Sequence, residues 1–291
     1  MTPGAAEPVP SRHPDSRIDP AGLPRLLVGS QAAGGRQDQP RRAFVAQIMG
    51  LPMSLHVRGP RAMDPVIQQV ADAAFARLRA DDGEFSTYQP DSAVSRIQRR
   101  ELLIRDASPR LREVVALCEE AATRTDGAFS AWIPRDGVPV FDPTGLVKGW
   151  AVAEAFERLL ADLAALGAHD ALLSAGGDVV VACTRIDTPD WVVAVEDPRD
   201  RSRVLTSVPL RRGAVATSGV SARGLHVLDA ATGSPATALL SATVIGPSLI
   251  WADVYATALL ASGGDAPWFA RLAVDHAALL VAPDGATTVL P

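Results

Sequence analysis

The pattern of apolar and polar positions changes character near residue 43. Residues 1–42 are rich in Pro, Gly, Arg and Asp and show no apolar period beyond the short patch "RLLVGS". Such a segment lacks the apolar content needed to form a core, so we expect a disordered N-terminal tail. From Ala43 onward, "AFVAQIMGLPMSLHV" predicts a strand, a break and a second strand.

Three helices are predicted between residues 64 and 167. The first has Asp64 as its N-cap and Pro65 at its first helical position. The second opens at Ser108, and the third runs from about Lys148 to Ala165 and stops before Gly167. Apolar residues at helical spacing mark the buried faces of the first two helices: Ile67, Val70, Ala74, Leu78, Leu111, Val114, Val115 and Cys118.

Strand patterns dominate the second half of the chain. They are "DALLS", "VVVAC", "WVVAVE", "AVATSG", "HVLDA" and "SATVIG". A helix near 252–262 and a short helix starting after Asp265 follow, and "AALLVAPDGATTVL" is typical of a hairpin with a PDG turn. Helices and strands mix without strict βαβ alternation, which predicts an α+β fold.

Composition narrows the class of protein. With 291 residues, 47% of them hydrophobic, the chain is long enough for one large domain or two closely packed ones. A net charge of −5 leaves no basic footprint for nucleic acid. No apolar run is long enough to span a membrane, and the N-terminus lacks the apolar segment of a signal peptide. We therefore expect no membrane insertion and a cytoplasmic location.

The chain contains a single lysine, Lys148, in the stretch "DPTGLVKGWA". This is not a P-loop, because Gly149 follows the lysine instead of preceding it. Flexible glycines and free N–H groups at a helix start nevertheless favour an anion, and an ammonium suits phosphate. The alternative is a solvated lysine in a first helical turn. A cation there opposes the helix dipole, so we expect its loss to leave the stability of the ligand-free protein unchanged or slightly raised.

Three further stretches carry candidate chemistry, and each has a structural alternative. "SAGGDV" is either a hairpin turn or a ligand-binding turn. The polar loop 215–235 carries His226 and Asp229, and a lone histidine is more often structural than catalytic. In "WADVYATALL", Asp253 and Thr257 lie four apart on one helical face, which suits oxygen ligation of Mg²⁺ or a carboxylate favoured by the helix dipole.

Together these stretches resemble the motifs of one family. "MGLPMSL", "EFSTYQPDSAVSRIQ", "TDGAFS", "DPTGLVKGWAV", "SAGGDV", "VATSG", "HVLDAATGSP" and "WADVYATAL" occur in that order along the chain. They are similar to the motifs of the ApbE family, the FAD:protein FMN transferases or flavin transferases. The resemblance covers roughly residues 44–290 and sets off residues 43–291 as one flavin transferase domain behind a 1–42 tail.

The resemblance implies a fold and a reaction. The fold would be a larger T-fold-like domain with a smaller α/β part and FAD between them. Such enzymes use FAD as substrate and Mg²⁺ as cofactor. A serine or threonine hydroxyl of a target protein attacks the FMN phosphorus, AMP leaves, and the target keeps FMN through a phosphoester. Mg²⁺-dependent hydrolysis of FAD to FMN and AMP, or non-catalytic FAD binding, stays open as an alternative.

The resemblance also implies roles for particular residues. Asp253 and Thr257 match side-chain ligands of Mg²⁺, and Gly145 matches a backbone ligand. His226 falls on the active-site histidine, and Lys148 would face the diphosphate. The general base is open between His226 and Asp142. The positions that match the FAD site are Met49, Tyr88, Thr125, Asp126, Gly127, Asp142, Lys148, Gly176, Gly177, Asp178, Ser218, His226 and Val227.

Overall fold

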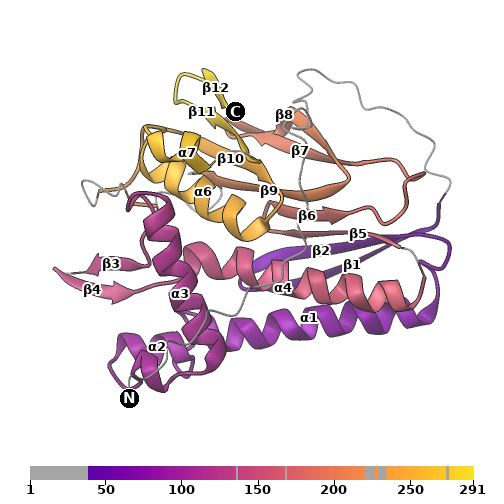
Figure 1. The fold of residues 1–291 in the computed structure, drawn as a ribbon, viewed down its shortest axis with the longest axis horizontal. Coiled ribbons are helices and arrows are strands. Elements are labelled where there is room, and N and C mark those ends of the chain that lie inside the picture. The colour runs from indigo at the N-terminus through magenta and orange to yellow at the C-terminus, as the bar shows by residue number, and fades with distance from the viewer. Residues whose placement is uncertain (1–38, 136, 168, 220–226, 229–233, 273–274) are drawn as a thin grey trace, which may run out of the picture.

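The structure is a computed structural model, and it describes residues 39–135, 137–167, 169–219, 227–228, 234–272 and 275–291 (Figure 1). Most of the predicted tail and the candidate residues His226 and Asp229 lie outside these ranges. The boundary at residue 43 stays a prediction, although the first strand already begins at Arg41.

An antiparallel sheet forms the centre of the described chain. Its eight strands follow the order β1-β2-β5-β6-β9-β10-β11-β12, so most neighbours in the sheet are also consecutive in the numbering of the strands (Figure 1). Their bounds are β1 Arg41–Ile48, β2 Leu51–Arg58, β5 Asp170–Ala175, β6 Asp178–Ala182, β9 Arg212–Gly219, β10 Ser241–Gly246, β11 Ala277–Val281 and β12 Thr287–Leu290. Helices occupy the connections from β2 to β5 and from β10 to β11, and part of each connection packs back onto this sheet.

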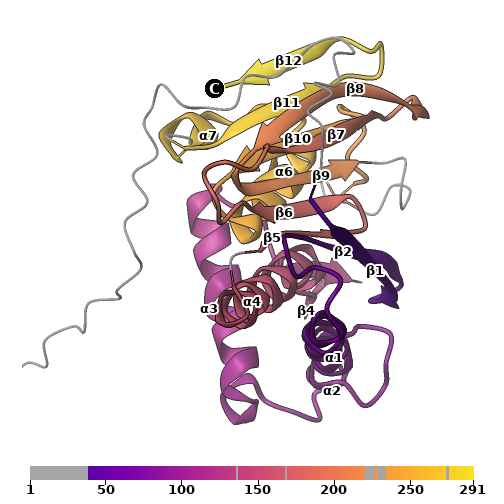
Figure 2. The same cartoon turned by 90° about the vertical axis from the view of Figure 1, so that its right-hand side faces the viewer.

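Helices α1, α4 and α6 contact the sheet, and α1 lies alongside α4 (Figures 1 and 2). The helical elements are α1 Pro65–Phe85, α2 Ala93–Gln98, the 3-10 helix η1 Ile104–Asp106, α3 Pro109–Arg124, α4 Thr144–Ala165, α6 Leu249–Ala261 and α7 Pro267–Leu272. Every helix in the described ranges is too short or too polar to cross a bilayer. The mixture of helices and an antiparallel sheet confirms the predicted α+β class.

The sheet separates two hydrophobic clusters because its side chains alternate between faces. Val180 and Ala182 of β6 belong to the large cluster shared with the helices. Val181, between them, belongs to a smaller cluster on the opposite side. That smaller cluster is closed by the separate hairpin of β7 Trp191–Asp197 and β8 Asp200–Leu210, where Trp191 and Val193 are buried.

Several local predictions are confirmed. The strand break after Ile48 is a two-residue turn in which Met49 and Gly50 have φ values of 54° and 68°, the positive φ required by a type I′ hairpin. Ser108 caps α3, since its Oγ accepts a hydrogen bond from the Leu111 N–H at 3.0 Å. The final hairpin joins β11 to β12 as the PDG turn predicted.

Other local predictions were wrong in detail. Asp64 precedes α1 but makes no capping bond, because its carboxylate accepts from Arg61 Nε at 2.7 Å instead. Helix α4 begins at Thr144, four residues before the predicted start at Lys148, because the Asp142 carboxylate accepts the Thr144 N–H. Strand β8 was missed because only its second half alternates between buried and exposed positions. The short hairpin of β3 Trp132–Arg135 and β4 Val138–Phe141 was missed as well.

Helix α1 carries one buried carboxylate, Asp81, which is only 2% exposed. Arg110 of α3 donates to it at 2.6 Å, and the same guanidinium lies over the ring of Trp150 of α4 at 4.5 Å from the centroid. Burial raises the pKa of Asp81 to about 6, and the nearby Arg77 opposes this rise only in part. Asp81 thus ties three helices together at a cost in desolvation.

This raised pKa predicts a pH dependence of stability. Between about pH 4 and pH 6 the folded state holds a proton on Asp81 that the unfolded state has lost, so stability falls as pH rises through this window. Asp81→Asn removes that term. As the pH is raised from about 4 to about 6, we expect the unfolding free energy of the variant to increase by about 1–3 kcal/mol relative to that of the native chain. Urea unfolding at both pH values measures this gain, with Asp72→Asn on the exposed side of α1 as control. A difference independent of pH would contradict the prediction.

Candidate functional site

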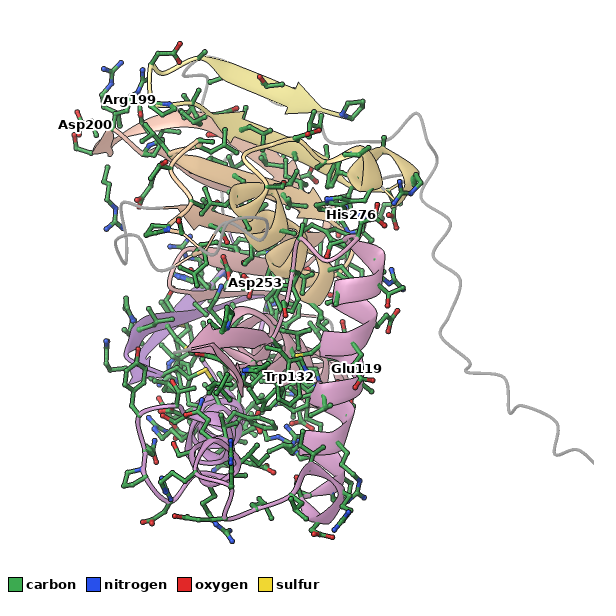
Figure 3. The ribbon with its side chains drawn as sticks, turned by 90° about the vertical axis from the view of Figure 1, so that its left-hand side faces the viewer. Glu119, Trp132, Arg199, Asp200, Asp253 and His276 are labelled. Atoms are coloured by element: carbon green, nitrogen blue, oxygen red, sulfur yellow. The ribbon has the colours of Figure 1, made fainter. Side chains whose placement is uncertain are left out.

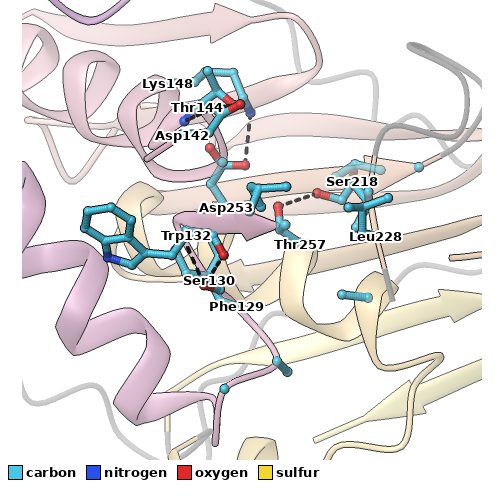
Figure 4. Close-up of a pocket in the computed structure, with 18 of the residues that line it drawn as sticks. Phe129, Ser130, Trp132, Asp142, Thr144, Lys148, Ser218, Leu228, Asp253 and Thr257 are labelled. Atoms are coloured by element: carbon cyan, nitrogen blue, oxygen red, sulfur yellow. Dashed lines mark hydrogen bonds and ion pairs between the residues drawn. The ribbon is translucent and has the colours of Figure 1, made fainter. Parts of the chain in front are cut away.

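A pocket of about 480 Å³ opens where the helices meet the sheet (Figure 4). Its walls come from the segment after α3 together with β3, the start of α4, the β5–β6 turn, the end of β9, and α6. Figure 3 shows Asp253 of α6 deep in the interior, whereas Arg199 and Asp200 lie at the outer tip of the β7–β8 hairpin. The volume is in the range typical of small-molecule sites.

Helices α4 and α6 approach each other closely beside this pocket. Gly145 lies against Thr257, and Gly149 lies against Asp253, so two glycines one turn apart face two polar residues one turn apart. A Cβ built on Gly149 would be 3.0 Å from both Cβ and Oδ2 of Asp253 and 3.2 Å from the carbonyl oxygen of Leu249. Glycine leaves this contact undisturbed, whereas a methyl group at position 149 would require the neighbouring atoms of α6 to shift by a few tenths of an ångström.

The charged groups of the site are buried around one ammonium. Lys148 Nζ lies 3.0 Å from Asp253 Oδ1 (Figure 4) and forms a second ion pair with Asp178. The side chain of Lys148 is 18% exposed, and those of Asp178 and Asp253 are 1% and 3% exposed. Backbone donors complete the set: Gly149 N–H donates to Asp253 Oδ2 at 3.1 Å, and Thr217 N–H donates to Asp178 Oδ1 at 3.1 Å. When all three groups are ionised, two carboxylates surround one cation, and the cluster carries net negative charge.

Hydroxyl groups continue the site along α6 and the sheet. Thr257 Oγ1, one turn beyond Asp253, lies 3.0 Å from Ser218 Oγ of β9 (Figure 4). Thr217 Oγ1 lies 2.9 Å from Thr243 Oγ1 on the neighbouring strand. The Asp253 carboxylate and the hydroxyl groups of Thr257 and Ser218 thus belong to residues that line the same pocket.

These oxygens fit a divalent cation of the Mg²⁺ type. The three residues predicted as its ligands, Gly145, Asp253 and Thr257, all line the pocket and adjoin one another across the α4–α6 contact. The excess of buried negative charge favours a further cation, and Mg²⁺ prefers oxygen ligands while keeping positions for phosphate and water. In the described ranges no group of three or more His, Cys, Asp and Glu side chains is placed to hold a metal, so such an ion would depend on one carboxylate with neutral oxygens.

Local structure positions the residues at the pocket mouth. Asp142 Oδ1 accepts from the N–H and the hydroxyl of Thr144 at 3.2 and 2.7 Å, which holds the carboxylate at the start of α4. At the end of α3, Asp126 and Gly127 have φ values of 51° and 84°, and Gly127 N–H donates to Ala122 O at 2.8 Å. This left-handed cap turns the chain into the pocket wall.

Six of the thirteen positions predicted for the FAD site line the pocket: Gly127, Asp142, Lys148, Gly176, Ser218 and Val227. Asp178 is not among the lining residues, but it forms an ion pair with Lys148, which is one of them. Gly177 completes the β5–β6 turn next to Gly176, so "SAGGDV" forms a hairpin turn, and Gly176 of that turn also lines the pocket. His226 lies outside the described residues.

The remaining four predicted positions do not line this pocket. Thr125 is buried, and its hydroxyl donates to Ala121 O at 2.8 Å and accepts from Phe129 N–H at 3.0 Å, which stabilises the end of α3. Asp126 pairs with Arg271 on the surface. Tyr88 is 94% exposed. Met49 belongs to the β1–β2 turn, where its N–H donates to Asp82 at 3.2 Å.

Residues that the sequence did not single out form an apolar wall of the pocket. They are Phe129, Trp132, Ile133, Pro134 and Leu228. Trp132 is 43% exposed and packs on Phe141 with ring centroids 5.2 Å apart. Trp132, Ile133 and Pro134 belong to the apolar run directly after "TDGAFS". This run contains no polar side chain that would indicate a binding site.

Three comparisons relate this chain to known proteins. The ApbE family model matches residues 49–135 and 137–280. A curated relative, the FAD:protein FMN transferase of Rhodobacter capsulatus, is 34% identical over 152 residues, which are 49% of this chain and 29% of the relative. The chain thus matches less than a third of that relative's length.

Solved structures share the fold. The ApbE protein of Thermotoga maritima superimposes with a TM-score of 0.74 at 21% identity, covering 86% of this chain and 96% of the other. The flavinyl transferase ApbE of Pseudomonas stutzeri has a TM-score of 0.70 at 24% identity, with coverages of 86% and 95%. The flavin transferase ApbE of Vibrio cholerae has a TM-score of 0.68 at 19% identity, with coverages of 87% and 97%.

The ion pairs of Lys148 give it a stabilising role that its place in the helix did not reveal. Lys148→Met leaves two buried carboxylates without their cation, and we expect the ligand-free protein to lose about 2–4 kcal/mol of unfolding free energy. Adding Asp178→Asn to that variant should restore part of the loss, because one unpaired charge is removed. Urea unfolding measures both. An unchanged midpoint for Lys148→Met would support the sequence-based expectation instead.

The close helix contact gives a second prediction, with a control in the same chain. Gly149→Ala is expected to destabilise by about 1–3 kcal/mol, because the new methyl overlaps the Asp253 side chain. Gly83→Ala near the end of α1 meets no atom within 4 Å and should stabilise by about 0.5–1 kcal/mol. In thermal unfolding, a lower melting temperature for Gly149→Ala and a higher one for Gly83→Ala would support the packing argument. A higher melting temperature for both variants would contradict it.

Proposed function

The chain belongs to the ApbE family, and we propose that it transfers FMN from FAD to a serine or threonine hydroxyl of a target protein, with Mg²⁺ as cofactor and AMP as leaving group. One observation carries the proposal. A buried cluster with one more carboxylate than cation adjoins a pocket of about 480 Å³ that is also lined by Thr257 and Ser218, whose hydroxyl groups lie 3.0 Å apart. The cytoplasmic location predicted from the sequence remains part of this proposal, as does the absence of a nucleic-acid partner.

The reaction exchanges one phosphorus–oxygen bond for another. The target hydroxyl oxygen bonds to the FMN phosphorus, and the bond from that phosphorus to the bridging oxygen of the diphosphate breaks. AMP leaves with the electron pair, and the hydroxyl proton passes to a base. Because the nucleophile belongs to another protein, this chain has to supply position, charge and a proton acceptor.

Negative charge on the diphosphate is the first barrier to this attack. Lys148 lines the pocket with its side chain 18% exposed, where its ammonium can donate to a phosphate oxygen. Gly145, Asp253 and Thr257 would hold Mg²⁺, which when bound neutralises the diphosphate and stabilises the departing AMP. The glycine contact between α4 and α6 keeps these ligand residues and Lys148 at one edge of the pocket.

The proton acceptor stays open between His226 and Asp142. Asp142 lines the pocket at the start of α4, and its Oδ1 is oriented by the N–H and hydroxyl of Thr144. A carboxylate so fixed is able to take a proton from a hydroxyl that enters the pocket mouth.

The test combines one variant with product analysis. Purified chain, FAD, Mg²⁺ and a candidate target are incubated, and the target is examined by mass spectrometry for an added FMN. Asp253→Asn should reduce transfer about a hundredfold or more, since it removes the only charged ligand proposed for the metal. Glu157→Gln, on an exposed part of the same α4, is the matched control and should transfer normally.

The products distinguish the alternatives. Labelled target with AMP supports the proposal. AMP with free FMN and no labelled target indicates an FAD pyrophosphatase, and FAD binding without any AMP indicates a non-catalytic flavin-binding protein. Full transfer by Asp253→Asn at low Mg²⁺ would remove the proposed metal site.

A further inference from the structure

Asp178 is the one charged residue of the cluster that does not line the pocket. It is the first residue of β6 and directly follows the two-residue turn of Gly176 and Gly177, whose φ values are 59° and 104°. Both carboxylate oxygens face inward: Oδ1 accepts the Thr217 N–H at 3.1 Å, and Oδ2 pairs with Lys148. At 1% exposure, Asp178 reaches a ligand in the pocket only through Lys148.

The turn that carries Asp178 is fixed by packing. A Cβ on Gly176 would lie 2.9 and 3.0 Å from the two terminal methyls of Leu51, so the β5–β6 turn is pressed against the β1–β2 turn. The Gly176 N–H also donates to Pro52 O at 3.2 Å. The Asp178 carboxylate is therefore anchored to the sheet, while the Asp253 carboxylate is carried by helix α6.

Lys148 stands between these two carboxylates, and its second contact competes with the proposed cation. Its Nζ lies 3.0 Å from Oδ1 of Asp253, the same side chain that would hold Mg²⁺. An ammonium and a divalent cation on one buried carboxylate repel each other strongly at such separations. Binding of the cation therefore requires another anionic partner for the Lys148 ammonium.

We propose that Asp178 is a positioning residue that retains the Lys148 ammonium on the sheet side and so leaves Asp253 available to a divalent cation. The inference rests on the proposed function, because it assumes that Asp253 binds Mg²⁺. Asp178 does not line the pocket. It acts through Lys148, which it holds beside the pocket and away from full pairing with Asp253.

A purely electrostatic effect of Asp178 predicts a different pattern. If its negative charge simply attracts Mg²⁺ through space, Asp178→Asn weakens Mg²⁺ binding whether or not Lys148 is present. If Asp178 acts through Lys148, the effect disappears once the ammonium is gone. A double-mutant cycle separates the two.

The experiment titrates Mg²⁺ by calorimetry into protein saturated with FAD, with no target protein present. Four chains are compared: the native one, Asp178→Asn, Lys148→Met and the double variant. Asparagine keeps the shape of Asp178 and still accepts the Thr217 N–H, and the double variant removes one charge of each sign. Glu157→Gln controls for loss of a distant negative charge.

We expect Asp178→Asn to raise the dissociation constant for Mg²⁺ about tenfold, a change of about 1.4 kcal/mol. In the Lys148→Met background the same substitution should change it less than about twofold. Lys148→Met alone should bind Mg²⁺ as tightly as the native chain or more tightly, because the competing cation is gone. This last measurement keeps the inference testable if Asp178→Asn folds poorly.

Three results would overturn the inference. Equal weakening in both backgrounds would assign the effect to charge alone, and an unchanged dissociation constant in Asp178→Asn would remove the role of Asp178. Either result leaves the proposed function standing. Absence of Mg²⁺ binding by the native chain would overturn the metal in the proposed function and the inference with it.

Discussion

The close contact between α4 and α6 is the constraint on which the rest of this site depends. Gly145 and Gly149 let α6 approach until Asp253 and Thr257 touch the first turns of α4. At this distance the Gly149 N–H donates directly to Asp253, and the Lys148 ammonium reaches the same carboxylate. A methyl at Gly149 would crowd Asp253, so the packing of the two helices and the position of the Asp253 carboxylate depend on each other.

Beside that contact, two buried carboxylates share a single ammonium, so their negative charge is only partly neutralised. Asp178 and Asp253 are both nearly inaccessible to water, and one ammonium serves both. Burying carboxylates is costly unless each is paired and hydrogen-bonded. Backbone N–H groups of Gly149 and Thr217 contribute, yet the cluster keeps an excess of negative charge. A divalent cation next to Asp253 would offset this excess, and this would link the stability of the ligand-free protein to its proposed function.

Packing within the sheet sets the position of the Asp178 carboxylate. Two tight turns, after β1 and after β5, lie next to each other and pack through Leu51 and Gly176. On the other face, the β7–β8 hairpin closes a second hydrophobic cluster around Trp191, so the strands are held from both sides. The position of Asp178, at the start of β6, is therefore set by the packing of the sheet. The position of Asp253 is set by the contact between α6 and α4.

Part of this molecule was determined by local sequence alone. Local sequence patterns predicted the start of α3 at Ser108, the break between the first two strands and the final hairpin, because these depend on residues close together in the chain. The order of the motifs pointed to the ApbE family, and the family model covers most of the chain. Gly145, Asp253 and Thr257 were singled out as one group from their residue types and the resemblance, and the structure places them together.

Tertiary structure alone decided what each of these residues touches. The partners of Lys148 lie 30 and 105 positions away, and no local pattern reports them. The same holds for Thr125, Asp126 and Tyr88, which match the family motifs but face the core, Arg271 or the surface and not the pocket. Periodicity determines which side of a helix is apolar. Which polar residue on one helix meets which glycine on another is set by packing across the whole core, and that information exists only in the folded chain.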